Sequence, residues 1–89
     1  MLSNKVALVT GSSRGIGASC IIEFAKKGYD VVINYNKSKE EALKLQDEIK
    51  KYKVNSLVIK CDIQSEEEII KMIEEVINKF GQIDVLVNN

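Results

Sequence analysis

Residues 10–17 read TGSSRGIG and directly follow the apolar run VALV of residues 6–9. Glycine lets a chain turn tightly and lets backbone N–H groups approach a pyrophosphate, and the start of a following helix favours that negative charge. The spacing is G-x-x-x-G-x-G, which differs from the G-x-G-x-x-G fingerprint and lacks the G-K-[ST] ending of a P-loop. The stretch therefore predicts a phosphate-binding turn between a strand and a helix.

Three further apolar runs follow along the chain. They are VVI at residues 31–33, LVI at residues 57–59 and IDVLV at residues 83–87. Such β-branched and nearly continuous runs are typical of strands buried on both faces of a parallel sheet.

Helical periods separate the four runs. Ser38-x-x-Glu41 and Ser65-x-x-Glu68 are capping boxes that predict the starts of the second and third helices, and Gly81 predicts the end of the third. The residues expected on apolar helix faces are Ile16, Cys20, Ile21, Phe24 and Ala25, then Ala42, Leu45, Ile49 and Tyr52, then Ile69, Met72, Ile73, Val76, Ile77 and Phe80. The order β-α-β-α-β-α-β predicts an α/β fold, a Rossmann-type doubly wound parallel sheet with strand order 3-2-1-4.

The composition excludes several classes of function. A chain of 89 residues forms one domain at most. Its 13 basic and 13 acidic side chains cancel, which removes the long-range attraction needed for nonspecific binding to nucleic acid or an anionic membrane. The sequence contains no histidine, so a Ser-His or Cys-His nucleophile and a His-containing metal site are excluded within it.

The cysteines and the start of the chain bear on location. Cys20 and Cys61 are far apart, have no C-x-x-C partner and are interpreted as small buried hydrophobes of a reduced protein. The apolar run within residues 1–10 is too short for a signal peptide or a membrane span. We therefore expect a cytoplasmic protein.

The loop of residues 10–17 resembles the T-G-x-x-x-G-[IL]-G motif of the classical short-chain dehydrogenase/reductase family. Three other segments match that family: CDI at residues 61–63, FGQID at residues 80–84, and VNN at residues 87–89, the start of an N-N-A-G motif. SRGIG and VINY are most similar to the wording of members that reduce 3-oxoacyl groups on acyl carrier protein in fatty-acid synthesis. The resemblance implies that residues 1–89 are the amino-terminal half of one NAD(P)-binding Rossmann domain.

The resemblance also implies a set of cofactor-binding residues. These are Gly11, Ser13, Arg14, Gly15, Ile16, Gly17, Asn34, Tyr35, Asn36, Lys37, Asp62, Ile63 and Asn89. In the family, Asp62 would accept a hydrogen bond from the adenine amine, Ile63 would offer a backbone contact, and Asn89 would lie at the ribose side. The alternatives are a simple loop or capping carboxylate for Asp62 and a strand-end turn residue for Asn89.

NADP is the expected cofactor. An NAD site usually carries a carboxylate at the end of the second strand, about 20 residues past the glycines. Here residues 34–37 read NYNK, and Asp30 lies at the wrong end of that strand. Arg14 and Lys37 suit the additional phosphate of NADP. The alternative for each is a solvated surface cation.

Two motifs imitate catalytic ones. Residues 11–15 fit G-x-S-x-G, but Ser13 has no histidine to act as its base. Tyr35-x-x-x-Lys39 has the family's catalytic spacing, but Tyr35 is expected to end a strand and Lys39 to begin a helix, so the two do not share a helical face. The family's catalytic Ser, Tyr and Lys are expected beyond Asn89, and no catalytic residue is assigned.

The resemblance implies a parent enzyme that is an NADPH-dependent carbonyl reductase. Its expected partners are a small-molecule or acyl-carrier-protein-bound carbonyl substrate, with no nucleic acid and no membrane, and it is expected to form a homo-oligomer, commonly a tetramer. The alternative is a noncatalytic nucleotide-binding or assembly module complete at 89 residues.

Overall fold

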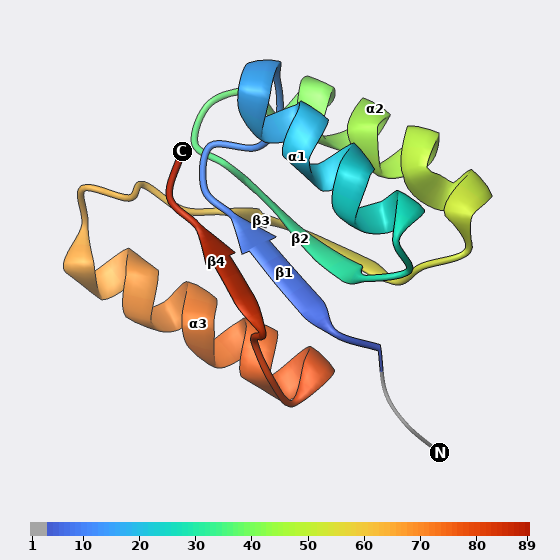
Figure 1. The fold of residues 1–89 in the computed structure, drawn as a ribbon. Helices are drawn as coiled ribbons and strands as arrows, with labels where there is room; N and C mark the ends of the chain where they lie inside the picture. The colour runs from blue at the N-terminus through green and yellow to red at the C-terminus, as the bar shows by residue number, and fades with distance from the viewer. Residues whose placement is uncertain (1–3) are drawn as a thin grey trace.

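The computed structural model describes residues 4–89, so the first three residues of the domain predicted over residues 1–89 lie outside it. Along the chain its elements are β1 (Val6–Val9), α1 (Gly15–Lys26), β2 (Asp30–Tyr35), α2 (Lys39–Ile49), a short 3-10 turn η1 (Lys50–Tyr52), β3 (Ser56–Lys60), α3 (Glu66–Phe80) and β4 (Val85–Val87) (Figure 1). No helix in this part of the chain is both long enough and apolar enough to cross a membrane.

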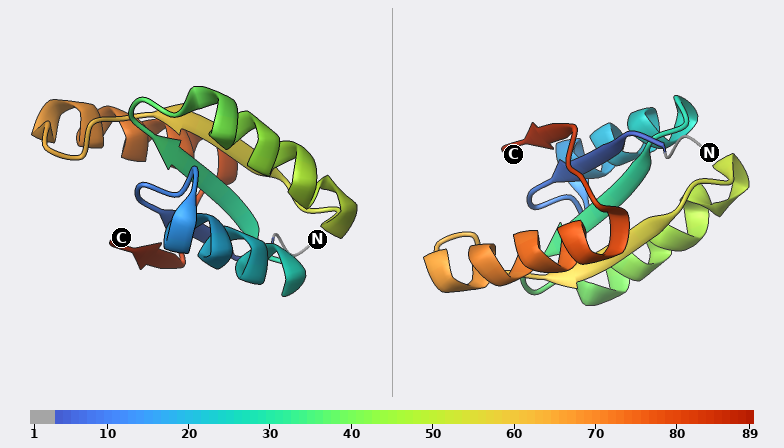
Figure 2. Two further views of the ribbon diagram at one scale, coloured as in Figure 1. Left: turned by 90° about the horizontal axis from the view of Figure 1, so that it is seen from above. Right: turned by 90° about the horizontal axis from the view of Figure 1, so that it is seen from below.

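The four strands form one parallel sheet in the order β3-β2-β1-β4, which confirms the predicted order. Leu8 in β1 lies opposite Val32 in β2 and opposite Leu86 in β4. Seen from above, α1 and α2 lie in front of the sheet, and seen from below α3 does, so the helices cover opposite faces (Figure 2). Because all strands are parallel, the loops that follow β1, β2 and β3 lie at one edge of the sheet.

Each face of the sheet has its own apolar core, because successive strand residues point to opposite faces. Under α1 and α2 the buried residues are Val9, Ile21, Ala25, Val31, Ile33, Ala42, Leu45 and Ile49. Under α3 they are Val6, Leu8, Val32, Ile59, Cys61, Met72 and Val76. A strand buried on both faces needs apolar residues at every position, which is why the strand runs lack a polar alternation.

Two of the predicted apolar helix positions are wrong. Ile16 is 77% exposed and Ile77 is 42% exposed. Ile16 lies in the first turn of α1 and belongs to neither of the two core clusters. Ile77 lies one residue past the buried Val76, and a step of one residue turns a helix by about 100°, away from the sheet.

The fourth strand is shorter than the run of residues 83–87 predicted. β4 begins at Val85, because the chain before it bonds to β1 through a side chain. The Asp84 carboxylate accepts the N–H of Val6 at 2.7 Å, and the N–H of Asp84 donates to the carbonyl of Val6 at 2.9 Å. This local arrangement fixes the register of β4 against β1.

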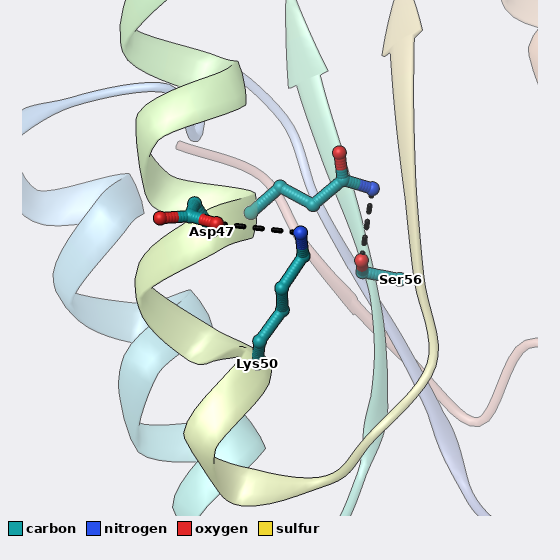
Figure 3. Close-up of polar contacts among 4 residues, drawn as sticks. Asp47, Lys50 and Ser56 are labelled. Atoms are coloured by element: carbon teal, nitrogen blue, oxygen red, sulfur yellow. Dashed lines mark hydrogen bonds and ion pairs between the residues drawn. The ribbon is translucent and has the colours of Figure 1, made fainter.

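One polar contact joins α2 to the neighbouring β3, and a second lies within the segment of α2 and η1 (Figure 3). The Gln46 amide donates to the hydroxyl of Ser56 at 3.0 Å, across the gap between helix and strand. The nearby ion pair between Lys50 and Asp47, at 3.3 Å, joins two side chains that are 73% and 78% exposed. Exposed pairs of this kind contribute little to stability, so the amide contact is the more important of the two.

The two predicted capping boxes behave differently. The Ser65 hydroxyl accepts the N–H of Glu68 at 3.3 Å, as predicted for α3, but the Glu68 carboxylate accepts the N–H of Asp62 and not that of Ser65, so only half of this box forms. Ser38 occupies the N-cap position of α2, but its side chain makes no capping hydrogen bond, so the capping box predicted at Ser38 is wrong. The backbone explains the difference, because ψ is 110° at Ser65 and 57° at Ser38, outside the extended conformation that aims a cap side chain at the helix.

We expect Ser65→Ala to lower the free energy of unfolding by about 1 kcal/mol, the usual value of an N-cap hydrogen bond. Ser38→Ala is the matched control and should cost clearly less, because its hydroxyl caps nothing. Urea denaturation followed by circular dichroism measures both changes. Equal losses for the two variants would contradict the assignment of the caps.

Candidate functional site

A cleft of about 430 Å³ opens at the edge of the sheet where β1, β2 and β3 end. Its walls come from the loop after β1, from the end of β2 and from the loop after β3. The lining residues are Gly11, Asn34, Asn36, Lys37, Cys61, Asp62, Ile63 and Gln64. Six of these were predicted as site residues from the sequence, and Cys61 and Gln64 were not. The other seven predicted residues do not line the cleft. Five of them lie in the glycine loop and at the start of α1, Tyr35 ends β2, and Asn89 follows β4.

The three glycines of the loop are needed for two different reasons. Gly11 and Gly15 have φ of +57° and +65°, in the left-handed region that L side chains rarely adopt. Gly17 is needed for space, because a Cβ there would lie 2.7 Å from the carbonyl oxygen of Gly11 and 2.8 Å from Cα of Ser12. The loop therefore folds back tightly onto the first turn of α1, as the spacing of the glycines predicts.

The start of α1 has no side-chain cap. Arg14 is its N-cap residue, makes no capping hydrogen bond through its side chain, and no acidic residue lies in the first turn. The first turn of α3, in contrast, carries three glutamates and the Ser65 cap. The first N–H groups of an α-helix have no partner within the helix and attract anions. An anion such as a phosphate is therefore the group that the start of α1 can accept.

Asn34, at the end of β2, holds the glycine loop from one side. Its Oδ1 accepts the N–H of Gly11 at 2.9 Å, its carbonyl accepts the N–H of Ser12 at 2.9 Å, and its own N–H donates to the Ser12 hydroxyl at 3.0 Å. Asn34 is 1% exposed and Ser12 is fully buried. Sequence reasoning missed Ser12 and assigned Asn34 to the cofactor, because a pairing across 22 residues leaves no local signal.

Asn89 holds the same loop from the side of β4. Its side-chain amide donates to the carbonyl of Gly11 at 3.1 Å, and its backbone N–H donates to the Thr10 hydroxyl at 3.0 Å. The N–H of Thr10 in turn donates to the carbonyl of Val87 at 3.0 Å. These bonds extend the pairing of β1 and β4 into the loop. The ribose contact expected of Asn89 stays a prediction.

The third wall of the cleft is the turn after β3. One oxygen of the Asp62 carboxylate accepts the N–H of Gln64 at 2.9 Å, and the N–H of Asp62 donates to the Glu68 carboxylate at 3.0 Å. The side chain of Asp62 thus stabilises its own turn, which was the alternative interpretation, and its contact with adenine stays a prediction. Ile63 is 42% exposed and offers the cleft an apolar surface.

The two predicted phosphate ligands occupy different places. Lys37 is exposed and lines the cleft directly. Arg14 is also exposed, but it stands at the start of α1 and is not among the residues that form the cleft wall. Lys37 is therefore the better-placed cation for a group bound inside the cleft.

Tyr35 and Asp30 lie at opposite ends of β2. Tyr35 is half-buried and packs against the apolar core under α1 and α2. Asp30 is 5% exposed at the opposite end of the strand, where its carboxylate accepts the N–H of Asn55 at 2.8 Å. The prediction that Asp30 lies at the wrong end to reach a ribose is therefore confirmed.

The motif Tyr35-x-x-x-Lys39 is a coincidence of spacing. Tyr35 is the last residue of β2 and Lys39 is the first of α2, so the two do not share a helical face. Ser13 lies half-buried in the glycine loop. Because the sequence contains no histidine, no histidine can act as a general base that activates Ser13 for nucleophilic attack.

Cys61 lies at the floor of the cleft, where it is 1% exposed. Burial raises the pKa of its thiol, and the nearby Glu68 and Asp62 carboxylates raise it further. The thiol therefore stays protonated at neutral pH and serves as a small apolar side chain. Cys20 packs into the core on the other face of the sheet, so the two cysteines cannot form a disulfide without a rearrangement of the fold.

Comparison with known proteins matches residues 5–89 to the short chain dehydrogenase family. A 3-oxoacyl-[acyl-carrier-protein] reductase, FabG, of Staphylococcus epidermidis is 48% identical over 97% of this chain and 35% of its own length. A hydroxynaphthalene reductase-like protein, Arp2, of Metarhizium guizhouense is 42% identical over 99% of the chain and 33% of its own length. The chain thus spans about a third of the length of these curated relatives.

A solved structure gives the same result for the fold. The acetoin dehydrogenase YohF from Salmonella typhimurium superposes with a TM-score of 0.88 at 34% sequence identity. The superposition covers 97% of this chain and 36% of the YohF chain.

Gly17→Ala and Gly15→Ala add the same methyl group at different cost. Gly17→Ala would press that group against the backbone of Gly11 and Ser12, so we expect a displaced loop and a loss of nucleotide affinity of at least about tenfold. Gly15→Ala meets no atom within 4 Å and should cost only the strain of a positive φ, about 1 kcal/mol of stability. Calorimetric titration and urea denaturation separate the two effects. Unchanged affinity in folded Gly17→Ala would contradict the close approach.

Proposed function

The chain belongs to the short-chain dehydrogenase/reductase family, and on this premise we propose that it forms the adenosine-binding and pyrophosphate-binding part of an NADPH-dependent carbonyl reductase. Members of this family are oxidoreductases that use a nicotinamide nucleotide. Bound NADPH would supply a hydride to the carbonyl carbon of the substrate. The residues of this chain bind and orient the cofactor, and the loop after β1 carries the groups that meet its phosphates.

The fit of the cofactor rests on the chemistry of the cleft. The start of α1, which has no side-chain cap, offers N–H groups to a pyrophosphate, and the missing Cβ of Gly17 lets the glycine loop pack closely against that first turn. We propose that adenine binds at Ile63 and the turn of Asp62, which line the cleft. The proposed adenosine site in the cleft and the proposed pyrophosphate site at the start of α1 then lie on either side of Gly11.

The preference for NADPH is supported by the charge at the end of β2. The segment of residues 34–37, NYNK, carries no carboxylate, and Lys37 lines the cleft. A carboxylate there would repel the 2′-phosphate of NADPH, whereas an ammonium group attracts it. This single observation carries the choice of NADPH over NADH.

The substrate proposal is supported by the relatives. A FabG protein named as a 3-oxoacyl-[acyl-carrier-protein] reductase shares 48% of its residues with this chain in the matched region. We therefore propose that the whole enzyme reduces a 3-oxoacyl group on acyl carrier protein in fatty-acid synthesis. The catalytic Ser, Tyr and Lys and the homo-oligomer interface are proposed to lie outside residues 1–89. Two free cysteines support a cytoplasmic location.

We expect the protein to bind NADPH at least about tenfold more tightly than NADH, a difference of about 1.4 kcal/mol. Lys37→Ala should weaken NADPH binding by about tenfold, because one charge-assisted contact is lost, and should leave NADH binding unchanged. Isothermal titration of both cofactors measures these constants. Equal affinity of the unaltered protein for NADPH and NADH would contradict the proposal.

Asn36→Asp tests whether a negative charge at the end of β2 shifts the cofactor preference from NADPH towards NADH. Tyr35→Asp would also place a carboxylate at the end of β2, but Tyr35 packs against the core, so that change would disturb folding as well. Asn36 is exposed and lines the cleft, so Asn36→Asp adds a negative charge without an apolar loss. We expect it to weaken NADPH binding and to keep NADH binding. Lys53→Ala, at an exposed lysine in the left-handed turn after η1, is the charge control and should change neither.

A further inference from the structure

The side chain of Asn34 contacts two loops that do not pair with each other in the sheet. β2 lies between β1 and β3, so the loop after β1 and the turn after β3 share no backbone ladder. The backbone of β2 holds each wall separately, because the Asn34 carbonyl accepts the N–H of Ser12 and the Tyr35 carbonyl accepts the N–H of Cys61, each at 2.9 Å. The Asn34 side chain is bonded to both walls at once.

The side-chain amide of Asn34 makes this link with both of its polar atoms. Its Oδ1 accepts the N–H of Gly11 at 2.9 Å, in the loop after β1. Its Nδ2 donates to the carbonyl of Cys61 at 3.2 Å and to that of Ile59 at 3.4 Å, at the end of β3. An amide is the smallest side chain that presents an acceptor on one side and a donor on the other.

The link is buried, so it has little competition from water. Asn34 is 1% exposed, and the Gly11 and Cys61 groups that it bonds belong to residues that line the cleft on opposite sides. A buried polar group that loses its partner costs much more than an exposed one. The positions of the glycine loop and of the turn at Asp62 are therefore coupled through one side chain.

From these contacts we propose that Asn34 is a positioning residue that sets the spacing between the two walls of the cleft, and that it acts on the nucleotide through Gly11 and Cys61 instead of binding it. The inference rests on the nucleotide-binding function proposed above. It differs from the role that the family resemblance implies, in which Asn34 is one of the residues that bind the cofactor.

Asn34→Asp tests the donor side of the link. The carboxylate still accepts from Gly11, but it cannot donate to the Cys61 carbonyl and faces that oxygen with a negative charge. We expect NAD⁺ affinity at about pH 8 to fall by about tenfold. At about pH 5.5 the affinity should recover, because this poorly solvated carboxyl group takes up a proton and then donates as the amide did. NAD⁺ is the probe because it lacks the 2′-phosphate, which itself titrates near about pH 6.

Asn78→Asp is the matched control for the added charge. It places the same carboxylate at an exposed position near the end of α3, outside the residues that line the cleft. Its NAD⁺ affinity should stay constant over the same change of pH. Full NAD⁺ affinity of folded Asn34→Asp at about pH 8, or a loss that does not recover on acidification, would overturn the proposal.

A measurement on the unaltered chain decides the question even if Asn34→Asp does not fold. Hydrogen exchange followed by NMR should find the Gly11 N–H and the Asn34 side-chain amide protected in the free protein, because both are bonded within it. NAD⁺ should shift the N–H signals at the start of α1 and leave the Asn34 amide little changed. Protection of the Asn34 amide only after addition of NAD⁺ would overturn the inference. Failure of NAD⁺ and NADP⁺ to bind would instead refute the proposed function.

Discussion

Both polar backbone groups of Gly11 are hydrogen-bonded to side chains, and the arrangement of the cleft depends on these two bonds. The N–H of Gly11 donates to the Asn34 side chain, and its carbonyl accepts from the Asn89 side chain. These bonds hold the loop after β1 between the ends of β2 and β4, the two strands that pair with β1. With Gly11 fixed, the close approach of Gly17 to Gly11 and Ser12 fixes the start of α1 against the loop.

The polar groups at this edge divide into those that build the cleft and those that remain available to a ligand. Asn34 and Ser12 are buried and bonded to each other and to the loop. The start of α1, Lys37 and Asn36 are exposed. Buried bonds gain strength from a low local dielectric, while exposed groups can exchange water for a ligand at small cost. A rigid frame with free groups at its rim is the arrangement that a binding site requires.

The elements of the fold could be predicted from the sequence because their signals are local. The continuous run of residues 6–9 indicates a strand buried on both faces, and Gly81, with φ of +81°, ends α3 where it was expected. The glycine spacing locates the turn for the same reason. Ile16 and Ile77 were misassigned because a helical period gives the width of a face but not where the sheet beneath it ends.

The site was less predictable than the fold, since its main contacts join residues far apart in sequence. Nothing near Ser12 indicates a partner at Asn34, and nothing near Asn34 indicates that its amide reaches Cys61. Ser38 and Ser65 have the same local pattern, yet only the backbone at Ser65 is extended enough for its hydroxyl to cap the helix. Such differences arise from backbone angles and tertiary packing, which a short motif does not encode.

A crystal structure of this chain with NADPH would show where the cofactor binds. We expect the pyrophosphate at the first N–H groups of α1, adenine at Ile63 and Asp62, and the 2′-phosphate within hydrogen-bonding distance of the Lys37 ammonium group. Asn34 should keep its bonds to Gly11 and Cys61 and make none to the dinucleotide. Density for NADPH at another face of the sheet, or a 2′-phosphate directed away from Lys37, would contradict this expectation.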